Sequence, residues 1–141
     1  MKILWTDGSA EPNPGPGGWA VIDATTKQPV LTGSEDHTTN IRMEGTALKE
    51  AMNYAAAHHE SLEIHTDSEF LVNVLTKWAP AWEKNGWQKK SGPIKNLDLV
   101  QELYQLYQDN DVKLIWVKGH AGLELNELAD KAAKLATKTQ S

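Results

Sequence analysis

Three strand-like segments fill most of the first 35 residues, and a long alanine-rich segment follows them. The strand-like segments are residues 2–8 (KILWTDG), 17–24 (GGWAVIDA) and 28–35 (QPVLTGSE), and their order along the chain predicts a meander. Residues 39–59 are rich in helix-forming residues and predict one helix of about 18 residues. A chain that begins in this way is expected to pack at least one helix against a sheet.

The remaining residues predict further strands and helices in alternation. Strands are expected at 61–67 and 112–120, and helices at 68–78, 97–108 and 126–138. Residues 79–96 contain two prolines and two glycines and are expected to be rich in loops. The last strand is apolar on both faces, so we expect both to be covered. The order β-β-β-α-β-α-α-β-α predicts an α/β sheet with antiparallel and parallel parts.

Length and composition narrow the class of protein. A chain of 141 residues, 40% of them hydrophobic and 23% charged, suits one compact domain over residues 1–141 and argues against disorder. The absence of cysteine excludes disulfides and thiolate metal sites. No apolar run approaches the roughly 18 residues of a membrane span. The N-terminal residues do not resemble a signal peptide, so a cytoplasmic protein with no membrane partner is expected.

The net charge of −5 argues against a nucleic-acid partner unless positive charge is concentrated locally. Residues 77–95 provide such a concentration, because they carry five lysines against the single acid Glu83, with three tryptophans interleaved. Lysines neutralise phosphates, and aromatic rings pack on sugars or bases. The alternative is that these tryptophans only pack the loop and its helix.

Two aspartates follow strands in the same local pattern. Asp7 stands in TDG and Asp67 in TDS, each preceded by Thr and followed by a small residue at the carboxyl end of an expected strand. Ligand sites of α/β sheets favour these strand ends. The alternative is structural, because Asp commonly begins a turn or caps the next helix.

Two further carboxylates lie near the starts of helices. Glu44 falls on the apolar face of its helix, where an unpaired carboxylate is costly and needs a cation. Asp130 lies in the second turn of the last helix, where a solvated aspartate is the default. If these two converge with the strand-end aspartates, the set would suit a hard cation such as Mg²⁺ or Mn²⁺.

Five segments resemble, in order and spacing, the motifs of type 1 ribonucleases H. They are TDGSAEPNPGPGGWA, TNIRMEGTAL, TDSEFLVNVL, WEKNGWQKKSGPIKN and VKGHAGLELNELADKAA, and together they cover essentially the whole chain. The resemblance implies the α/β ribonuclease H-like fold: a five-stranded mixed sheet, three antiparallel strands plus two parallel, flanked by helices. It also implies two divalent metal ions, Mg²⁺ or alternatively Mn²⁺. Their ligands would be Asp7, Glu44, Asp67 and Asp130.

The same resemblance implies roles for residues around the carboxylates. His120, in the loop KGHAG, matches a histidine that assists proton transfer or product release, although a plain surface histidine is the alternative. The glycine-rich stretch after Asp7 matches a turn beside the RNA strand. Asn13 and Asn40 match substrate-contacting asparagines, and Thr39 matches a residue that helps to hold a phosphate of the DNA strand.

Residues 77–96 match the basic, tryptophan-rich handle with which the family grips the DNA strand. The candidate contacts within it are Trp78, Lys84, Lys89 and Lys90. The positive charge of these lysines would allow the segment to bind nucleic acid although the net charge of the chain is −5.

The function implied is endonucleolytic hydrolysis of the RNA strand of RNA–DNA hybrids by two-metal-ion catalysis, with 5′-phosphate and 3′-hydroxyl products. A monomer with no obligate protein partner is expected. One alternative is a hybrid-binding module without catalysis. Another is a nuclease of similar fold that acts on a different substrate, as resolvases and transposases do.

Overall fold

The computed structural model describes residues 1–58, 60–89, 91–119 and 122–138. Within them, one sheet contains β1 (Lys2–Ala10), β2 (Gly15–Asp23), β3 (Gln28–Thr38), β4 (Leu62–Thr66) and β5 (Val112–Trp116), in the order β3-β2-β1-β4-β5. β1, β2 and β3 form an antiparallel meander, whereas β4 pairs parallel with both β1 and β5. The expected mixed sheet, three antiparallel strands plus two parallel, is therefore confirmed.

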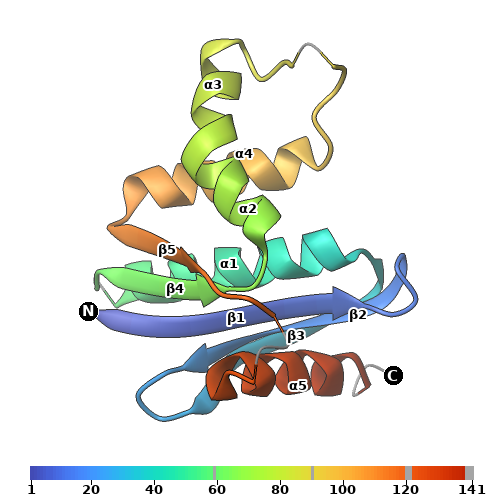
Figure 1. Ribbon diagram of the computed structural model, residues 1–141, viewed down its shortest axis with the longest axis vertical. Helices are drawn as coiled ribbons and strands as arrows, with labels where there is room; N and C mark the ends of the chain where they lie inside the picture. Colours follow the sequence, from blue (N-terminus) through green and yellow to red (C-terminus); the bar gives the residue numbers. More distant parts are fainter. Residues whose placement is uncertain (59, 90, 120–121, 139–141) are drawn as a thin grey trace.

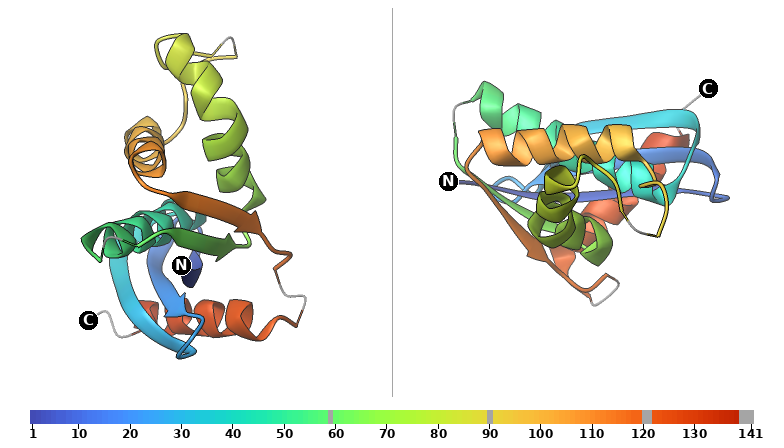
Figure 2. Two further views of the ribbon diagram at one scale, coloured as in Figure 1. Left: turned by 90° about the vertical axis from the view of Figure 1, so that its left-hand side faces the viewer. Right: turned by 90° about the horizontal axis from the view of Figure 1, so that it is seen from above.

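Helices cover both faces of the sheet (Figure 1). α1 (Asn40–Ala57) packs on one face, α5 (Glu124–Lys138) on the other, and α4 (Leu97–Asp109) packs beside α1, toward the extending helices. α2 (Glu69–Asn73), the π-helix η1 (Val74–Trp78) and α3 (Ala79–Lys84) follow one another and extend away from the sheet (Figure 2). We call residues 69–96 the protrusion. Within the described residues, no helix is both long and apolar enough to cross a membrane.

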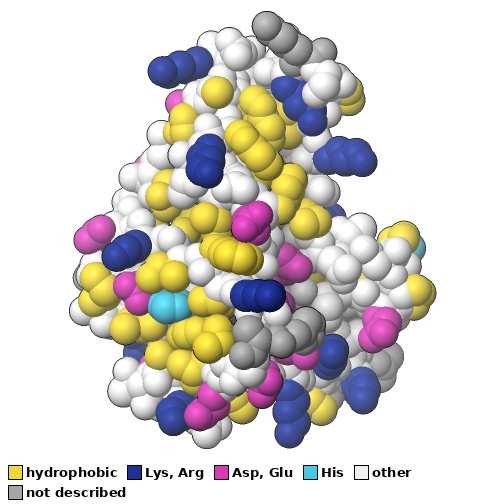
Figure 3. Space-filling view, viewed as in Figure 1, with side chains coloured by type: hydrophobic (Ala, Val, Ile, Leu, Met, Phe, Trp, Pro, Cys, Tyr) yellow, Lys and Arg dark blue, Asp and Glu magenta, His cyan; other side chains and the backbone are white. Residues whose placement is uncertain are grey.

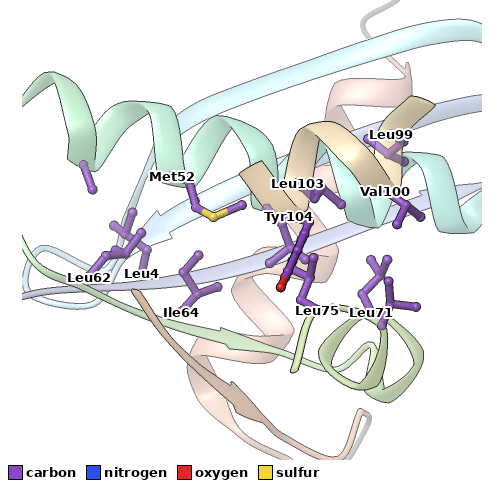
Figure 4. Packing of buried hydrophobic residues seen from close by; sticks show 14 of the residues in the cluster. Leu4, Met52, Leu62, Ile64, Leu71, Leu75, Leu99, Val100, Leu103 and Tyr104 are labelled. Atoms are coloured by element: carbon purple, nitrogen blue, oxygen red, sulfur yellow. The ribbon is translucent and has the colours of Figure 1, made fainter. Parts of the chain in front are cut away.

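The main apolar core lies between the sheet and helices α1 and α4 (Figure 4). Leu4 of β1 and Ile64 of β4 are fully buried in one cluster with Met52 of α1 and Leu103 of α4. Leu75 extends the same cluster into the base of the protrusion. Each such side chain contributes about 1.5–3 kcal/mol through burial. The core therefore fixes the central strands and α1, on which the functional side chains stand.

β5 corrects the expectation that the last strand is covered on both faces. None of its five residues is fully buried, and Trp116 keeps 45% of its surface exposed. β5 lies at the edge of the sheet, while α5 packs mainly on β1, β2 and β3 near the opposite edge. The strand also ends at Trp116, four residues earlier than predicted.

The helix expected at 68–78 extends further than predicted, whereas the described part of residues 85–96 contains no helix, as expected for a loop-rich segment. The helical conformation continues past Trp78 to Lys84, with Pro80 in the first turn of α3. Proline has no N–H and its ring crowds the carbonyl four residues earlier, which is Thr76. The wider π turn at Val74–Trp78 directly precedes that proline, so the helix bulges instead of stopping.

Candidate active site

Three carboxylates meet where β4 ends beside β1. Asp67 follows β4 directly and Glu44 projects from the second turn of α1, whereas Asp7 lies within β1, three residues before its end, and not at the strand end expected from the sequence. One carboxylate oxygen from each of the three lies within 4.8 Å of the others. The expected convergence of these three residues is therefore present in the fold.

The strand register explains why the two aspartates meet. β1 and β4 are parallel neighbours, and Thr6 is the pairing partner of Thr66. Asp7 and Asp67 each come one residue later, so they occupy equivalent positions on adjacent strands. The repeated Thr-Asp pattern of the sequence thus becomes a side-by-side pair in the sheet.

Glycine allows α1 to approach β1 closely enough to add Glu44. A β-carbon on Gly8 would lie 2.3 Å from the carbonyl carbon of Met43 and 2.5 Å from the backbone nitrogen of Glu44. Because backbone atoms cannot move aside as a side chain can, this contact requires glycine. A β-carbon on Gly119 would likewise lie 2.9 Å from Oδ2 of Asp67, so Gly119, three residues after β5, also lies against the cluster.

Burial and mutual repulsion change the acidity of the cluster. Burial, together with the nearby charges of Asp67, Asp130 and Glu44, raises the pKa of Asp7 to about 8, although the Gly8 N–H donates to it at 2.9 Å. Burial also raises the pKa of Glu44 to about 7, against a hydrogen bond from Ser68. Carboxylates that repel one another in a poorly hydrated site favour a bound cation, which removes the repulsion.

Asp130 stands beside this trio and not within it. Among the described residues, the group of mutually close carboxylate oxygens comprises Asp7, Glu44 and Asp67. Oδ2 of Asp130 accepts instead from the Lys134 ammonium, one turn further along α5, at 3.2 Å. Its charge still acts on Asp7, so α5 delivers the fourth expected carboxylate to the rim of the cluster.

Two polar residues at the cluster were missed in the sequence. Asn126 of α5 is buried, and its Nδ2 donates to Oδ2 of Asp67 at 3.4 Å. Ser68 is buried, hydrogen-bonds to Glu44 and caps α2 through the N–H of Leu71. The spacing of Asn126 four residues before Asp130 places both on one helix face and was the available signal.

Asn13, Thr39 and Asn40 come together at the start of α1. The backbone N–H of Asn40 donates to Oδ1 of Asn13 at 3.1 Å, and Oδ1 of Asn40 accepts from the N–H of Ala10 at 2.7 Å. The Thr39 hydroxyl oxygen caps α1 by accepting from the N–H of Arg42 at 3.2 Å. These bonds fix the glycine-rich turn against α1 and leave the amide NH₂ groups and the hydroxyl proton as donors.

The protrusion combines exposed aromatic rings with lysines. Trp78 is 39% exposed and packs edge-on against Phe70, and both rings line a hollow of about 600 Å³ together with Lys89 and Lys95. Figure 3 shows hydrophobic side chains gathered over this part of the molecule with Lys and Arg side chains around them. Lys84 is exposed at the end of α3 and does not line that hollow.

The remaining two expected site residues, Lys90 and His120, lie outside the described residues. Their assignments stay predictions.

The chemistry of the donor set fits a hard divalent cation. All three converging groups are carboxylates, the ligand type that Mg²⁺ and Mn²⁺ prefer. Two of them have raised pKa values that a bound cation would lower again. Among the described residues, no lysine or arginine forms an ion pair with this trio.

The chain is similar to known ribonucleases. The sequence profile of the RNase H family matches residues 1–138. A ribonuclease H from Methylorubrum extorquens is 45% identical over 94% of this chain, which spans 58% of that relative's length. A ribonuclease H from Gluconobacter oxydans is 41% identical over 92% of this chain and 87% of its own length.

Solved structures agree with the sequence comparison. The crystal structure of LC9-RNase H1, a type 1 RNase H with the type 2 active-site motif, is 31% identical over the whole of this chain and 74% of its own, with a TM-score of 0.79. A foamy viral protease–reverse transcriptase superposes with a TM-score of 0.82 at 21% identity, over 98% of this chain and 94% of that one, which shows a shared fold. The chain belongs to the RNase H family.

Proposed function

We propose that the chain is an endonuclease that hydrolyses the RNA strand of RNA–DNA hybrids with the help of Mg²⁺. The observation that carries the proposal is the convergence of Asp7, Glu44 and Asp67 within 4.8 Å where β4 ends beside β1. Membership of the RNase H family supports the substrate class.

Asp7, Glu44 and Asp67, with Asp130 at the rim, would hold the metal ions. When bound, two divalent ions supply an activated water and stabilise the charge on the leaving 3′-oxygen, and this gives 5′-phosphate and 3′-hydroxyl ends. The carboxylates would position the metal ions and would not attack the phosphate themselves. Asn126 and Gly8 N–H orient the aspartates through the hydrogen bonds described above.

Substrate recognition is assigned to two surfaces on either side of the carboxylates. Asn13 and Asn40 direct their amide NH₂ groups to the 2′-hydroxyls of the RNA strand, which distinguish RNA from DNA. Thr39 donates to a phosphate of the DNA strand. In the protrusion, Trp78 packs on a sugar of the DNA strand while Lys84, Lys89 and Lys90 neutralise its phosphates.

His120 is assigned a role in proton transfer or product release. An imidazole titrates near neutral pH, and such assistance is typically worth about 10²–10⁴-fold in rate. A monomer that needs no protein partner, and a cytoplasmic location, also stay predictions.

A cleavage assay with matched duplexes tests the proposal. Labelled RNA–DNA, RNA–RNA and DNA–DNA duplexes of one sequence are incubated with the protein in Mg²⁺ and in EDTA. Cleavage of the RNA in the hybrid alone, and only with Mg²⁺, is expected. Binding without cleavage would identify a non-catalytic module, and cleavage of DNA–DNA would identify a nuclease of another substrate class.

A further inference from the structure

A second cationic hollow lies on the α5 side of the carboxylates. It measures about 270 Å³ and is lined by Ser9, Glu11, Lys134, Thr137 and Lys138. It lies between the end of β1 and the C-terminal half of α5, below the turn that joins β1 to β2 in Figure 1. Two ammonium groups and the Ser9 hydroxyl outnumber the single carboxylate of Glu11 there, so the lining suits an anion.

Close helix–strand packing builds this hollow. A β-carbon on Gly18 of β2 would lie 2.3 Å from the carbonyl oxygen of Ala133 and 2.5 Å from Oγ1 of Thr137. The last turns of α5 therefore press directly on the sheet beside the end of β1. The Thr137 hydroxyl donates to the Ala133 carbonyl at 3.1 Å, which fixes its oxygen in place. Lys134 and Lys138, one turn apart, are exposed on either side of that threonine.

Lys134 connects the hollow to the carboxylate cluster. Its ammonium nitrogen lies 3.2 Å from Oδ2 of Asp130. If Asp130 helps to hold a metal at the scissile phosphate, Lys134 stands next to that phosphate. Successive phosphates of one strand recur about every 3.4 Å along the helix axis, so the neighbouring ones fall within reach of these two lysines.

We propose that Lys134 and Lys138 form a subsite for a backbone phosphate of the cleaved strand, one to three nucleotides from the scissile phosphate. The inference rests on the proposed function and assigns to α5 a contact separate from the protrusion, which lies on the opposite side of the sheet (Figure 2). In the protein without substrate, Lys134 pairs with Asp130; in the complex, its ammonium turns to the phosphate.

Salt-dependent binding tests the subsite directly. The affinity for an RNA–DNA hybrid is measured in Ca²⁺, which is expected to permit binding without efficient cleavage, at salt concentrations that we set from about 50 to about 300 mM. The proteins compared are the wild type, Lys134→Ala, Lys138→Ala and the control Lys131→Ala. Lys131 is exposed on the same helix but lines a different hollow, with Lys27 and Pro29, so its loss removes an equal charge elsewhere. We expect each of the first two variants to reduce the log–log salt slope by about 0.7–0.9 and the control to leave it unchanged.

A neutral-phosphate scan identifies the strand. In a series of hybrids, one phosphate of the RNA strand at a time is replaced by an uncharged methylphosphonate. Each is compared with a hybrid that keeps the phosphate, and both carry a 2′-O-methyl group at that nucleotide so that the RNA backbone does not break there. At one position near the scissile phosphate, the replacement should weaken wild-type binding several-fold and should not weaken Lys138→Ala further. That result establishes the contact, because a purely structural effect of the variant would not depend on one phosphate.

Three other results would overturn either the subsite or the proposed function. A wild type that binds the hybrid well while Lys134→Ala and Lys138→Ala keep its salt slope would overturn the subsite and leave the proposed function standing. Equal slope losses in all three variants, Lys131→Ala included, would assign the effect to overall charge and also overturn it. A wild type that shows no preference for the hybrid over DNA–DNA would overturn the proposed function itself.

Discussion

At the scale of single residues, Asp7 combines the features of a metal ligand with a cost to the folded state. It is 6% exposed, stands in the middle of the sheet and faces two other carboxylates within 4.8 Å. Its pKa of about 8 means that the metal-free protein holds a proton there which the unfolded chain, with a pKa near 3.8, releases. A side chain kept in spite of this cost indicates a functional site.

The variant Asp7→Asn should therefore be inactive and, without metal, more stable. Between pH 4 and 8 the folded wild type binds more protons than the unfolded chain, so its stability falls as pH rises through that range. In EDTA the variant should melt several degrees higher than the wild type at pH 8 and at a similar temperature at pH 4. Its cleavage rate should fall by about 10²–10³-fold or more. A melting difference that does not change with pH would contradict the assigned cause.

Asn126 is expected to act as a positioning residue for Asp67. Removal of the partner of a metal ligand typically lowers metal affinity or activity by about 10–100-fold. Asn126→Ala should raise the Mg²⁺ concentration needed for half-maximal cleavage by about that factor. The matched control is Asn110→Ala, because Nδ2 of Asn110 donates to a backbone carbonyl, that of Leu106 in α4, and not to a carboxylate of the cluster. An unchanged Mg²⁺ requirement in Asn126→Ala would leave the residue a structural role alone.

At the scale of elements, the site depends on how closely β1 and α1 approach each other. The β1–β4 register aligns the two aspartates, and the glycine at position 8 lets α1 bring Glu44 to them. The protrusion is a second element with its own task, because its helix continues through Pro80 and holds Trp78 in an exposed position.

Gly8→Ala should separate β1 from α1. The new methyl group meets backbone atoms of Met43 and Glu44, and such overpacking typically costs about 1–3 kcal/mol. We expect a lower melting temperature together with weaker Mg²⁺ binding by calorimetry. Gly33→Ala, on β3 and two strands away from β1, is the control for overpacking in general, because the atoms nearest to its methyl group would be those of the Trp19 side chain and not the backbone of α1. Equal Mg²⁺ affinities in Gly8→Ala and wild type would show that Glu44 does not depend on this contact.

Within the protrusion, lysines that line the Trp78 hollow should matter more than Lys84. Lys89 and Lys95 lie at that hollow, whereas Lys84 does not. The double variant Lys89→Ala/Lys95→Ala should reduce the log–log salt slope of hybrid binding by roughly 1.4–1.8 and change turnover at saturating substrate little. Lys113→Ala, an exposed lysine on β5, is the control. A larger loss from Lys84→Ala than from Lys89→Ala would move the DNA strand to the tip of the protrusion.

At the scale of the whole molecule, positive and negative side chains are gathered on separate surfaces of an acidic protein. Net charge is −5, yet lysines lie along the protrusion on one side of the carboxylates and along α5 on the other. The carboxylates lie between these surfaces, where the sheet joins its two helical layers. A ligand that binds only the folded protein there will stabilise the entire fold.

Divalent ions should therefore raise the melting temperature. A ligand present at 100 times its dissociation constant adds about 2.7 kcal/mol to the free energy of unfolding. Mg²⁺ and Ca²⁺ should both produce a concentration-dependent increase in the wild type, and Asp7→Asn should lose most of it. Ca²⁺ accepts looser geometry and should stabilise the protein without supporting efficient cleavage. An identical increase in Asp7→Asn would place the bound ion elsewhere.

Sequence alone was sufficient to predict the helices and strands with strong periodicity and the types of residue that form the candidate site. The alternation in β1, the alanine-rich α1 and the repeated Thr-Asp pattern are local properties, and the motifs around them pointed to the family. The end of β5 and the helix through Pro80 were predicted wrongly. The edge position of β5, and the bulge instead of a break in the helix before Pro80, depend on which other elements pack against these segments. The pattern of residues within each segment does not contain that information.

The tertiary structure alone decided which side chains share a site. The register of Thr6 with Thr66 and the close approach at Gly8 bring residues from three separate elements within 4.8 Å, and no spacing along the chain gives such distances. The same holds for Asn126, whose contact with Asp67 forms only because α5 packs on the sheet. Sequence determined which chemical groups were available; packing of α1 and α5 on opposite faces of one sheet determined their distances, burial and charge.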